Sequence, residues 1–133
     1  MNVSIQKIDI FGPNAVFEHI GIALNQIKDV SKNIDKIQDK IQNVNLGFID
    51  CNGLTVELVE PIDANSPINS FIEKKQTYYH ICFSVPDLDA SIASAKKYNF
   101  VKISKPVPAI AFDNRRIVWL YNIKFGLVEL LEN

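Results

Sequence analysis

The sequence predicts an α+β fold built from two copies of one βαβββ module, within a single domain over residues 1–133. Residues 17–24 (FEHIGIAL) and 78–85 (YYHICFSV) share an aromatic entry, a His-Ile pair and alternating apolar residues. Residues 54–60 (LTVELVE) and 126–132 (GLVELLE) both place a glutamate between apolar strand residues. A stretch with helical spacing follows each histidine strand, so the whole order of elements repeats.

The first module is expected over residues 15–61. After its histidine strand, an amphipathic helix is predicted, because apolar residues recur at steps of three and four: Ile27, Val30, Ile34, Ile37 and Ile41. Two further strands, 44–50 and 54–60, are expected to form a hairpin around the turn signal Asn52-Gly53. The module is shortened, with little room for its second strand.

Residues 62–76 are interpreted as a connector between the two modules. It contains a short predicted helix, with Ser66 as the N-cap and Pro67 at the first helical position. Ahead of the first module, residues 5–11 alternate weakly and end at a Gly-Pro turn signal. That stretch is predicted to be either a short edge strand or an arm.

The second module is expected over residues 77–132. Asp87 is predicted to cap its helix, and residues 105–108, which contain two prolines, cannot pair as a central strand. Three further strands are expected in this half: 100–103, 116–121 and 126–131.

Composition narrows the range of partners. Hydrophobic residues make up 47% of the chain and charged residues 22%, as in a soluble globular protein. The net charge is −1 and the basic residues cluster only in pairs, which argues against nucleic acid or an anionic membrane as a main partner. No apolar run is long enough to span a bilayer and no signal pattern begins the chain, so a cytoplasmic location is expected. Cys51 and Cys82 are interpreted as buried free thiols in preference to a disulfide.

Four strand residues are candidate metal ligands: His19, Glu57, His80 and Glu129. Taken singly, a strand histidine is more often structural, and a mid-strand glutamate usually faces water. These four, however, occupy equivalent positions in the two repeats, and they include both histidines of the chain. Packing of the repeats about a pseudo-twofold axis would bring them together as two imidazoles and two carboxylates. Such a set, completed by water or substrate, suits a nickel, cobalt, zinc, manganese or iron ion.

The motifs FEHIGIA (17–23), VELVEP (56–61), NSPINSF (65–71), YHICFSV (79–85) and GLVELLE (126–132) resemble the vicinal oxygen chelate superfamily, also described as glyoxalase, bleomycin resistance and dioxygenase proteins. Methylmalonyl-CoA epimerases and glyoxalase I (lactoylglutathione lyase) are the most similar branches. The resemblance covers residues 17–132. It implies two paired modules that form a cup-shaped mixed sheet around one metal, with ligands at the four candidate positions, and a homodimer.

The resemblance also implies a lyase or isomerase that uses one divalent metal, namely nickel, cobalt, zinc or manganese. Both branches remove a proton from a carbon next to a carbonyl, whose developing charge the metal stabilises. Glu129 and Glu57 are the candidate acid and base, because they flank the metal from opposite repeats. The expected substrate is a small thioester or thiol adduct of the CoA or glutathione type. Between epimerase and glyoxalase the sequence does not decide.

Further residues are candidates for substrate binding. Arg115 or Arg116 is suited to hold a carboxylate or phosphate, the alternative being a solvated strand edge. Cys82 and Ser84 lie on the face of His80, where they line the pocket or simply fill space. Trp119 is interpreted as a packing residue.

Two rival functions remain. One is an iron extradiol dioxygenase, which uses two histidines and one carboxylate, so that Glu57 as a fourth ligand counts against it. The other is a metal-free binding protein of the same fold, such as a drug-sequestering resistance protein. Two departures from the family pattern bear on the substrate, namely the short first module and residues 105–116, which replace a glycine-rich segment.

Overall fold

A computed structural model describes residues 2–133, so Met1 of the predicted domain lies outside the described residues. The described strands form one mixed sheet in the order β2-β3-β4-β1-β5-β9-β8-β6, and β7 pairs with β8 at the edge. In the first half of the chain the strands are β1 (Val16–Ala23), β2 (Ile37–Asp39), β3 (Val44–Cys51) and β4 (Leu54–Pro61). In the second half they are β5 (Tyr78–Val85), β6 (Val101–Lys102), β7 (Val107–Ala109), β8 (Arg115–Asn122) and β9 (Gly126–Glu132). The helices are α1 (Ile68–Glu73) and α2 (Leu88–Lys96), with 3₁₀ turns η1 (Ile27–Asp29) and η2 (Ile110–Phe112).

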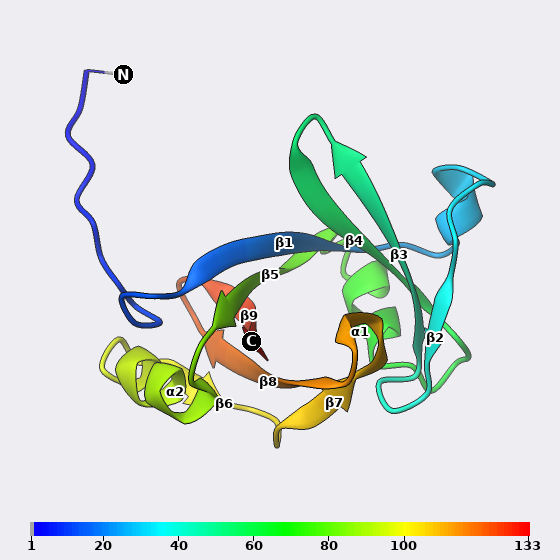
Figure 1. The fold of residues 1–133 in the computed structure, drawn as a ribbon. Helices are drawn as coiled ribbons and strands as arrows, with labels where there is room; N and C mark the ends of the chain where they lie inside the picture. Colours follow the sequence, from blue (N-terminus) through cyan, green and yellow to red (C-terminus); the bar gives the residue numbers. More distant parts are fainter. Residues whose placement is uncertain (1) are drawn as a thin grey trace.

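The centre of the sheet has the twofold pattern that the repeat predicts. Strands β1 and β5 pair antiparallel, with Gly21 opposite His80 and His19 opposite Cys82. On their outer sides, β1 pairs parallel with β4 and β5 pairs parallel with β9. Glu57 is level with Gly21, and Glu129 is level with Cys82, so each glutamate is in register with the residue two positions after a histidine. The sheet curls into an open cup around this centre (Figure 1).

The predicted helix over residues 27–41 is wrong. This stretch forms only the 3₁₀ turn η1 and the short strand β2. Only part of its apolar stripe is buried: Ile27 is buried, whereas Val30 and Ile41 are exposed. Ten of its fifteen residues are Ile, Asp, Val, Ser or Asn, whose helix propensity is lower than that of Ala, Leu or Lys.

Hydrogen bonds to Glu60 on β4 keep the same stretch in its non-helical conformation. Its carboxylate accepts hydrogen bonds from the Ile27 backbone N–H (2.7 Å) and from Lys36 Nζ (3.1 Å). Asn45 Nδ2 on β3 donates a third bond to it (3.1 Å). Bonds from two points nine positions apart fix the chain along the sheet, because a hydrogen bond to a buried carboxylate outweighs weak local helix propensity.

The outer face of each half is covered differently. In the second half α2 packs against the sheet, and Leu88 and Ala95 share a core with Val118 and Leu130. In the first half η1 takes that place, and Ile27 packs on Val56 and Leu58. None of the helices within residues 2–133 is long and apolar enough to cross a membrane.

Several local predictions are confirmed. Asn52 and Gly53 form the β3–β4 turn with positive φ values of 55° and 91°, as a two-residue hairpin turn requires. The Asp87 side chain caps α2 by accepting from the Ala90 N–H (3.0 Å). Residues 105–108 form no central strand, since Val107 and Pro108 belong to β7, which among the described strands pairs only with β8, and Val107 is opposite Ile117.

Other local predictions are corrected. Ser66 Oγ has no hydrogen-bond partner among the described residues, so it is not the side-chain cap of α1, and its backbone carbonyl accepts from the Asn69 N–H instead. Residues 5–11 contain no strand, so the arm, one of the two predicted alternatives, is the form observed, and Phe11 at its end packs into the core (Figure 1). Cys82 is a buried free thiol as predicted, but Cys51 is exposed beside the hairpin turn.

Candidate metal centre

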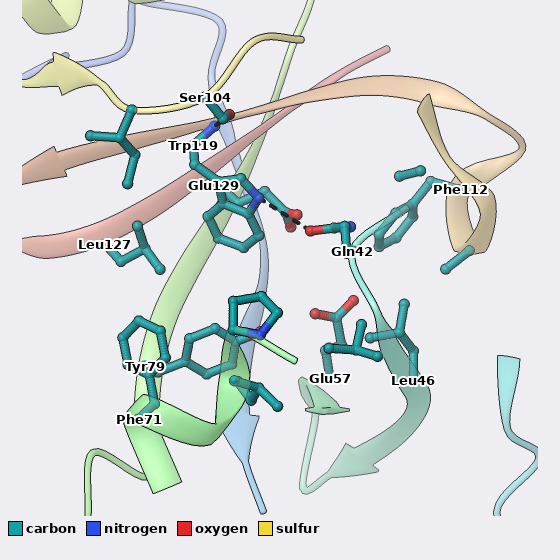
Figure 2. A pocket seen from close by; sticks show the side chains of 16 residues that line it. Gln42, Leu46, Glu57, Phe71, Tyr79, Ser104, Phe112, Trp119, Leu127 and Glu129 are labelled. Carbon is teal, nitrogen blue, oxygen red and sulfur yellow. Dashed lines mark hydrogen bonds between the residues drawn. The ribbon is translucent and has the colours of Figure 1, made fainter. Parts of the chain in front are cut away.

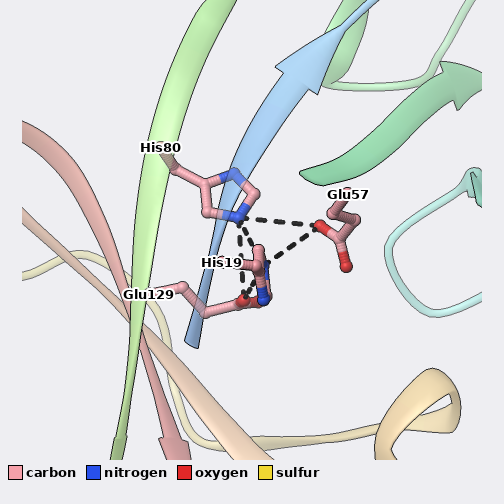
Figure 3. A group of neighbouring side chains, drawn as sticks. All are labelled: His19, Glu57, His80 and Glu129. Atoms are coloured by element: carbon pink, nitrogen blue, oxygen red, sulfur yellow. Dashed lines mark hydrogen bonds and ion pairs between the residues drawn. The ribbon is translucent and has the colours of Figure 1, made fainter. Parts of the chain in front are cut away.

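Four side chains from four strands meet on the inner face of the cup (Figure 3). They are His19 on β1, Glu57 on β4, His80 on β5 and Glu129 on β9, and we call them the four-residue cluster. All four are buried, and one candidate ligand atom from each lies within 4.8 Å of the others. His19 Nε2 is 3.1 Å from His80 Nε2. The Oε1 atoms of Glu57 and Glu129 lie 3.6 and 3.4 Å from His19 Nε2. They lie 3.6 and 3.7 Å from His80 Nε2.

These separations fit a shared divalent cation. With ligands about 2.1 Å from the ion, neighbouring donors stand about 3.0 Å apart at right angles and about 3.4 Å apart in a tetrahedron. The measured contacts to His19 run from 3.1 to 3.6 Å. Glu129 Oε1 is buried with no hydrogen-bond partner in the described part of the chain, although it points into the cluster. A cation at the centre would satisfy this oxygen and separate the two facing imidazole nitrogens.

Gly21 makes room for the His80 ring. A Cβ at this position would lie 2.0 Å from His80 Cε1 and 2.1 Å from Nδ1, far inside van der Waals contact. Because Gly21 is directly opposite His80 on β1, the ring leans across the neighbouring strand to reach the cluster. The glycine is therefore part of the geometry that places His80 Nε2 beside His19.

The four groups titrate very differently without a metal. Burial lowers the pKa of His19, but the adjacent carboxylates of Glu129 and Glu57 outweigh it and raise the pKa to about 10. Burial lowers the pKa of His80 to about 4 and raises that of Glu57 to about 7. The burial of Glu129 acts in the same direction, but the imidazoles of His19 and His80 beside it leave its pKa lowered. The metal-free cluster thus holds a proton on His19 between two carboxylates.

A cavity of about 250 Å³ opens beside the cluster (Figure 2). Glu57 and Glu129 line it. Most of its other lining side chains are apolar or aromatic, including those of Leu46, Phe71, Tyr79, Phe112, Trp119 and Leu127. Helix α1 contributes to one wall through Ile68 and Phe71. The cluster is therefore reached through a mostly apolar chamber.

A hydrogen bond between the two halves spans this cavity. Trp119 Nε1 on β8 donates to Gln42 Oε1, between β2 and β3, at 3.2 Å (Figure 2). Gln42 Nε2 in turn donates to Asp39 Oδ2 at 3.0 Å. The Trp119 ring also meets His80 edge-on, with centroids 4.9 Å apart. Trp119 is thus both a packing residue, as predicted, and a cavity wall.

Sequence reasoning gave no site role to three residues of this wall: Trp119, Gln42 and Phe112. Trp119 is directly opposite Glu129 in the β8–β9 pair, and that register was a usable signal for its place in the site. Gln42 and Phe112 lie in irregular segments without such a signal, although Phe112 stacks on His19 with the ring planes 7° apart.

The four predicted substrate-binding residues lie elsewhere. Arg116 forms a bidentate pair with Glu132, at 3.0 and 2.9 Å. Arg115 Nε donates to the Phe112 carbonyl at 3.1 Å. Cys82 is buried with Ala109, Ile117 and Leu131. Among the described cavity-lining residues, none of Arg115, Arg116, Cys82 and Ser84 appears, and their role in substrate binding stays a prediction.

Comparison with known proteins decides the family. The family model described as the Glyoxalase/Bleomycin resistance protein/Dioxygenase superfamily matches residues 17–119. The chain belongs to this superfamily. A crystal structure of the hypothetical protein BH1468 from Bacillus halodurans C-125, at 27% identity, superposes with a TM-score of 0.74 over 90% of this chain and 95% of that one. The cup-like sheet is thus the fold of this superfamily.

The curated relatives match this chain over only part of their own length. Uncharacterized protein YqjC of Bacillus subtilis is 37% identical over 76 residues, covering 50% of this chain and 54% of YqjC. The mitochondrial methylmalonyl-CoA epimerase of Dictyostelium discoideum is 29% identical over 108 residues, covering 78% of this chain and 63% of the epimerase. The chain therefore spans less than two thirds of the length of these superfamily members.

Proposed function

We propose that this protein is a divalent-metal-dependent lyase or isomerase that transfers a proton at a carbon next to a carbonyl. The observation that supports this best is the convergence of His19, Glu57, His80 and Glu129 to within 4.8 Å at the end of an apolar cavity. A divalent cation held by the cluster would supply Lewis-acid polarisation of the substrate carbonyl. Nickel, cobalt, zinc and manganese all suit two imidazoles and two carboxylates.

Glu57 and Glu129 are the proposed acid and base. They come from opposite repeats and both line the cavity, so a carbon between them is exposed to a carboxylate on each side. One of the two, as the carboxylate, takes the proton from the carbon, and the other, as the carboxylic acid, gives its proton to the opposite side, which inverts the centre and exchanges their protonation states. Return to a neighbouring carbon gives an isomerisation instead.

The substrate is proposed to be a thioester or thiol adduct of the CoA or glutathione type. The epimerase relative from Dictyostelium, whose name contains a CoA thioester, supports this class. The volume of the cavity, about 250 Å³, exceeds the roughly 150 Å³ of an apolar cavity that binds benzene. That space takes a short acyl group, so the thiol carrier would lie outside it.

The protein is further proposed to act as a homodimer. Apolar side chains on the adjacent central strands β1 and β5 face solvent: Phe17 is 45% exposed, Tyr78 76% and Ile81 39%. We take these exposed apolar side chains, spread along the β1–β5 pair, as part of an interface. Sedimentation equilibrium should therefore give twice the chain mass, and Tyr78→Lys should yield monomer.

Elemental analysis combined with deuterium exchange tests the proposed chemistry. Purified wild-type protein, reconstituted and dialysed, should retain about one divalent metal per chain, and His80→Ala should retain none, because one of its four ligands is gone. Ser91→Ala on α2, a buried polar residue outside the cluster, serves as the matched control and should keep the metal. Loaded wild-type protein in deuterated water should exchange the α-proton of an acyl-CoA thioester, as followed by mass spectrometry.

The outcomes separate the proposal from its rival. Metal bound by wild type and Ser91→Ala but lost in His80→Ala, together with proton exchange, supports the enzyme. A wild-type protein that takes up no metal after reconstitution refutes it. Ligand binding that survives unchanged in His80→Ala would then favour a metal-free binding protein, for which the aromatic walls Phe112 and Trp119 are also suited.

A further inference from the structure

The cavity beside the cluster has no cationic wall. Among its lining residues in the described chain there is no lysine and no arginine. Arg116 is paired with Glu132. Arg115 donates to the Phe112 carbonyl and lies over the Phe112 ring, 5.7 Å from its centroid, but it is not among the residues that line the cavity. A negatively charged group that entered the cavity would therefore meet no counter-charge from its walls.

Neutral hydrogen-bond donors are also scarce there. The Trp119 Nε1–H is used by Gln42, and the side-chain amide of Gln42 donates to Asp39. The Trp119 backbone N–H is bound to Ser104 Oγ at 2.9 Å. The remaining side-chain donors of the wall are the second amide N–H of Gln42 and the hydroxyls of Ser104 and Tyr79, fewer than the roughly four hydrogen bonds that a carboxylate accepts.

The carboxyl groups of the cluster point the same way. A carboxylate added to the cavity would lie beside Glu57 and Glu129, in a chamber walled by Leu46, Phe112 and Trp119. Burial of an unpaired charge in such surroundings is strongly unfavourable.

We propose that the group which the substrate places in this cavity is short, apolar and uncharged, and that a second carboxylate on the reacting carbon is rejected. This inference rests on the proposed metal-dependent proton transfer and narrows its substrate class. A branched alkyl or phenyl group fits the chamber, whereas a methylmalonyl group, which carries a free carboxylate, does not suit it. The protein would then differ in substrate from the relatives named for that compound.

A matched pair of chelating ligands tests this preference by binding alone. Isobutyrohydroxamate and the monohydroxamate of methylmalonic acid differ only in the exchange of one methyl group for a carboxylate. Isothermal titration calorimetry is carried out on wild-type protein loaded with zinc, with the zinc content measured beforehand. We expect the uncharged ligand to bind at least tenfold more tightly.

A charge-reversing variant provides the second arm. Ile103 lines the cavity yet is 56% exposed, so Ile103→Arg adds a cation at the mouth without burying it. This variant should narrow or reverse the difference in affinity between the uncharged and the carboxylate ligand. Ile123→Arg, at a position 85% exposed and away from the cavity wall, is the matched control and should leave the preference unchanged.

Each result has a defined meaning. Equal or tighter binding of the carboxylate ligand to loaded wild type overturns the inference while the metal function stands. Binding of neither ligand to loaded protein overturns it as well. Failure to take up zinc is seen before any ligand is added, and it refutes the proposed function and the inference together.

Discussion

Replacement of Gly21 by alanine should expel His80 from the cluster. The new Cβ would lie 2.0 Å from His80 Cε1, whereas ordinary contacts begin at 3.4 Å, so the ring must shift by about 1.4 Å. Trp119 and Tyr79 enclose the ring at centroid distances of 4.9 and 4.4 Å, so it cannot move without leaving its present position. Metal–ligand distances tolerate about 0.2 Å, and the variant should thus lose the His80 ligand.

The expected loss of metal affinity is at least about 100-fold, or about 2.7 kcal/mol, because substitutions that only disturb ligand orientation already cost about 10- to 100-fold. Competition with a chromophoric chelator measures the affinity, and circular dichroism checks the fold. Gly47→Ala is the matched control, since its Cβ would meet Ile34 Cγ2 at 2.7 Å and disturb packing away from the cluster.

A double mutant makes the test specific. In a His80→Ala background the obstructing ring is gone, so adding Gly21→Ala should change metal affinity no further. The reasoning is refuted if Gly21→Ala alone binds metal within about threefold of wild type, a difference of well under 1 kcal/mol. It is also refuted if Gly47→Ala loses as much affinity as Gly21→Ala.

Three further predictions follow from the hydrogen bonds and pKa values. Gln42→Ala leaves Trp119 Nε1 without its acceptor and should lower the free energy of unfolding by about 1–3 kcal/mol in urea titrations; an unchanged midpoint would contradict this. Burial raises the pKa of Glu60, but its bonds from Ile27 N–H and Lys36 outweigh it and leave the pKa lowered. Glu60 therefore contributes stability above its unfolded pKa of about 4.3, and this stability is lost as the pH falls through the pKa of Glu60 in the folded protein. Glu60→Gln should remove that part of the pH dependence of the unfolding free energy, between about pH 6 and 3. Since His19 holds a proton up to a pKa of about 10, metal uptake at pH 7 should release at least one proton and tighten about tenfold per pH unit. Calorimetry in two buffers of different ionisation enthalpy measures this release, and identical heats would count against it.

Much of the central sheet could be predicted because it depends on local signals that repeat. The His-Ile and Val-Glu motifs fixed four strands, and period-two alternation put His19 and His80 on one face. Asn52-Gly53 fixed the hairpin turn, which needs positive φ at both residues. Because the two repeats are equivalent, the proximity of the four cluster residues could be predicted without any knowledge of distances.

The errors share a physical cause. The apolar residues of 27–41, at steps of three and four, fit a helix. The structure differs because Glu60, distant in sequence, binds the Ile27 N–H and Lys36. Arg116 looked free to bind an anion because its partner, Glu132, is sixteen residues away on the neighbouring strand. In both cases a carboxylate distant in sequence decided the structure, and single-sequence patterns carry no record of such pairs.

The two halves keep equivalent site residues although their outer layers differ. A helix, α2, covers the second half, whereas a 3₁₀ turn and an extended segment held by Glu60 cover the first. The cluster tolerates this difference because its geometry depends on strand register alone, with Glu57 level with Gly21 and Glu129 level with Cys82. Substitutions in the outer layer should accordingly change stability and leave metal affinity intact. Glu60→Gln and Gly21→Ala test this from two sides. Glu60→Gln alters the outer layer and should leave metal affinity intact, whereas Gly21→Ala alters the inner face of the sheet and should lower metal affinity.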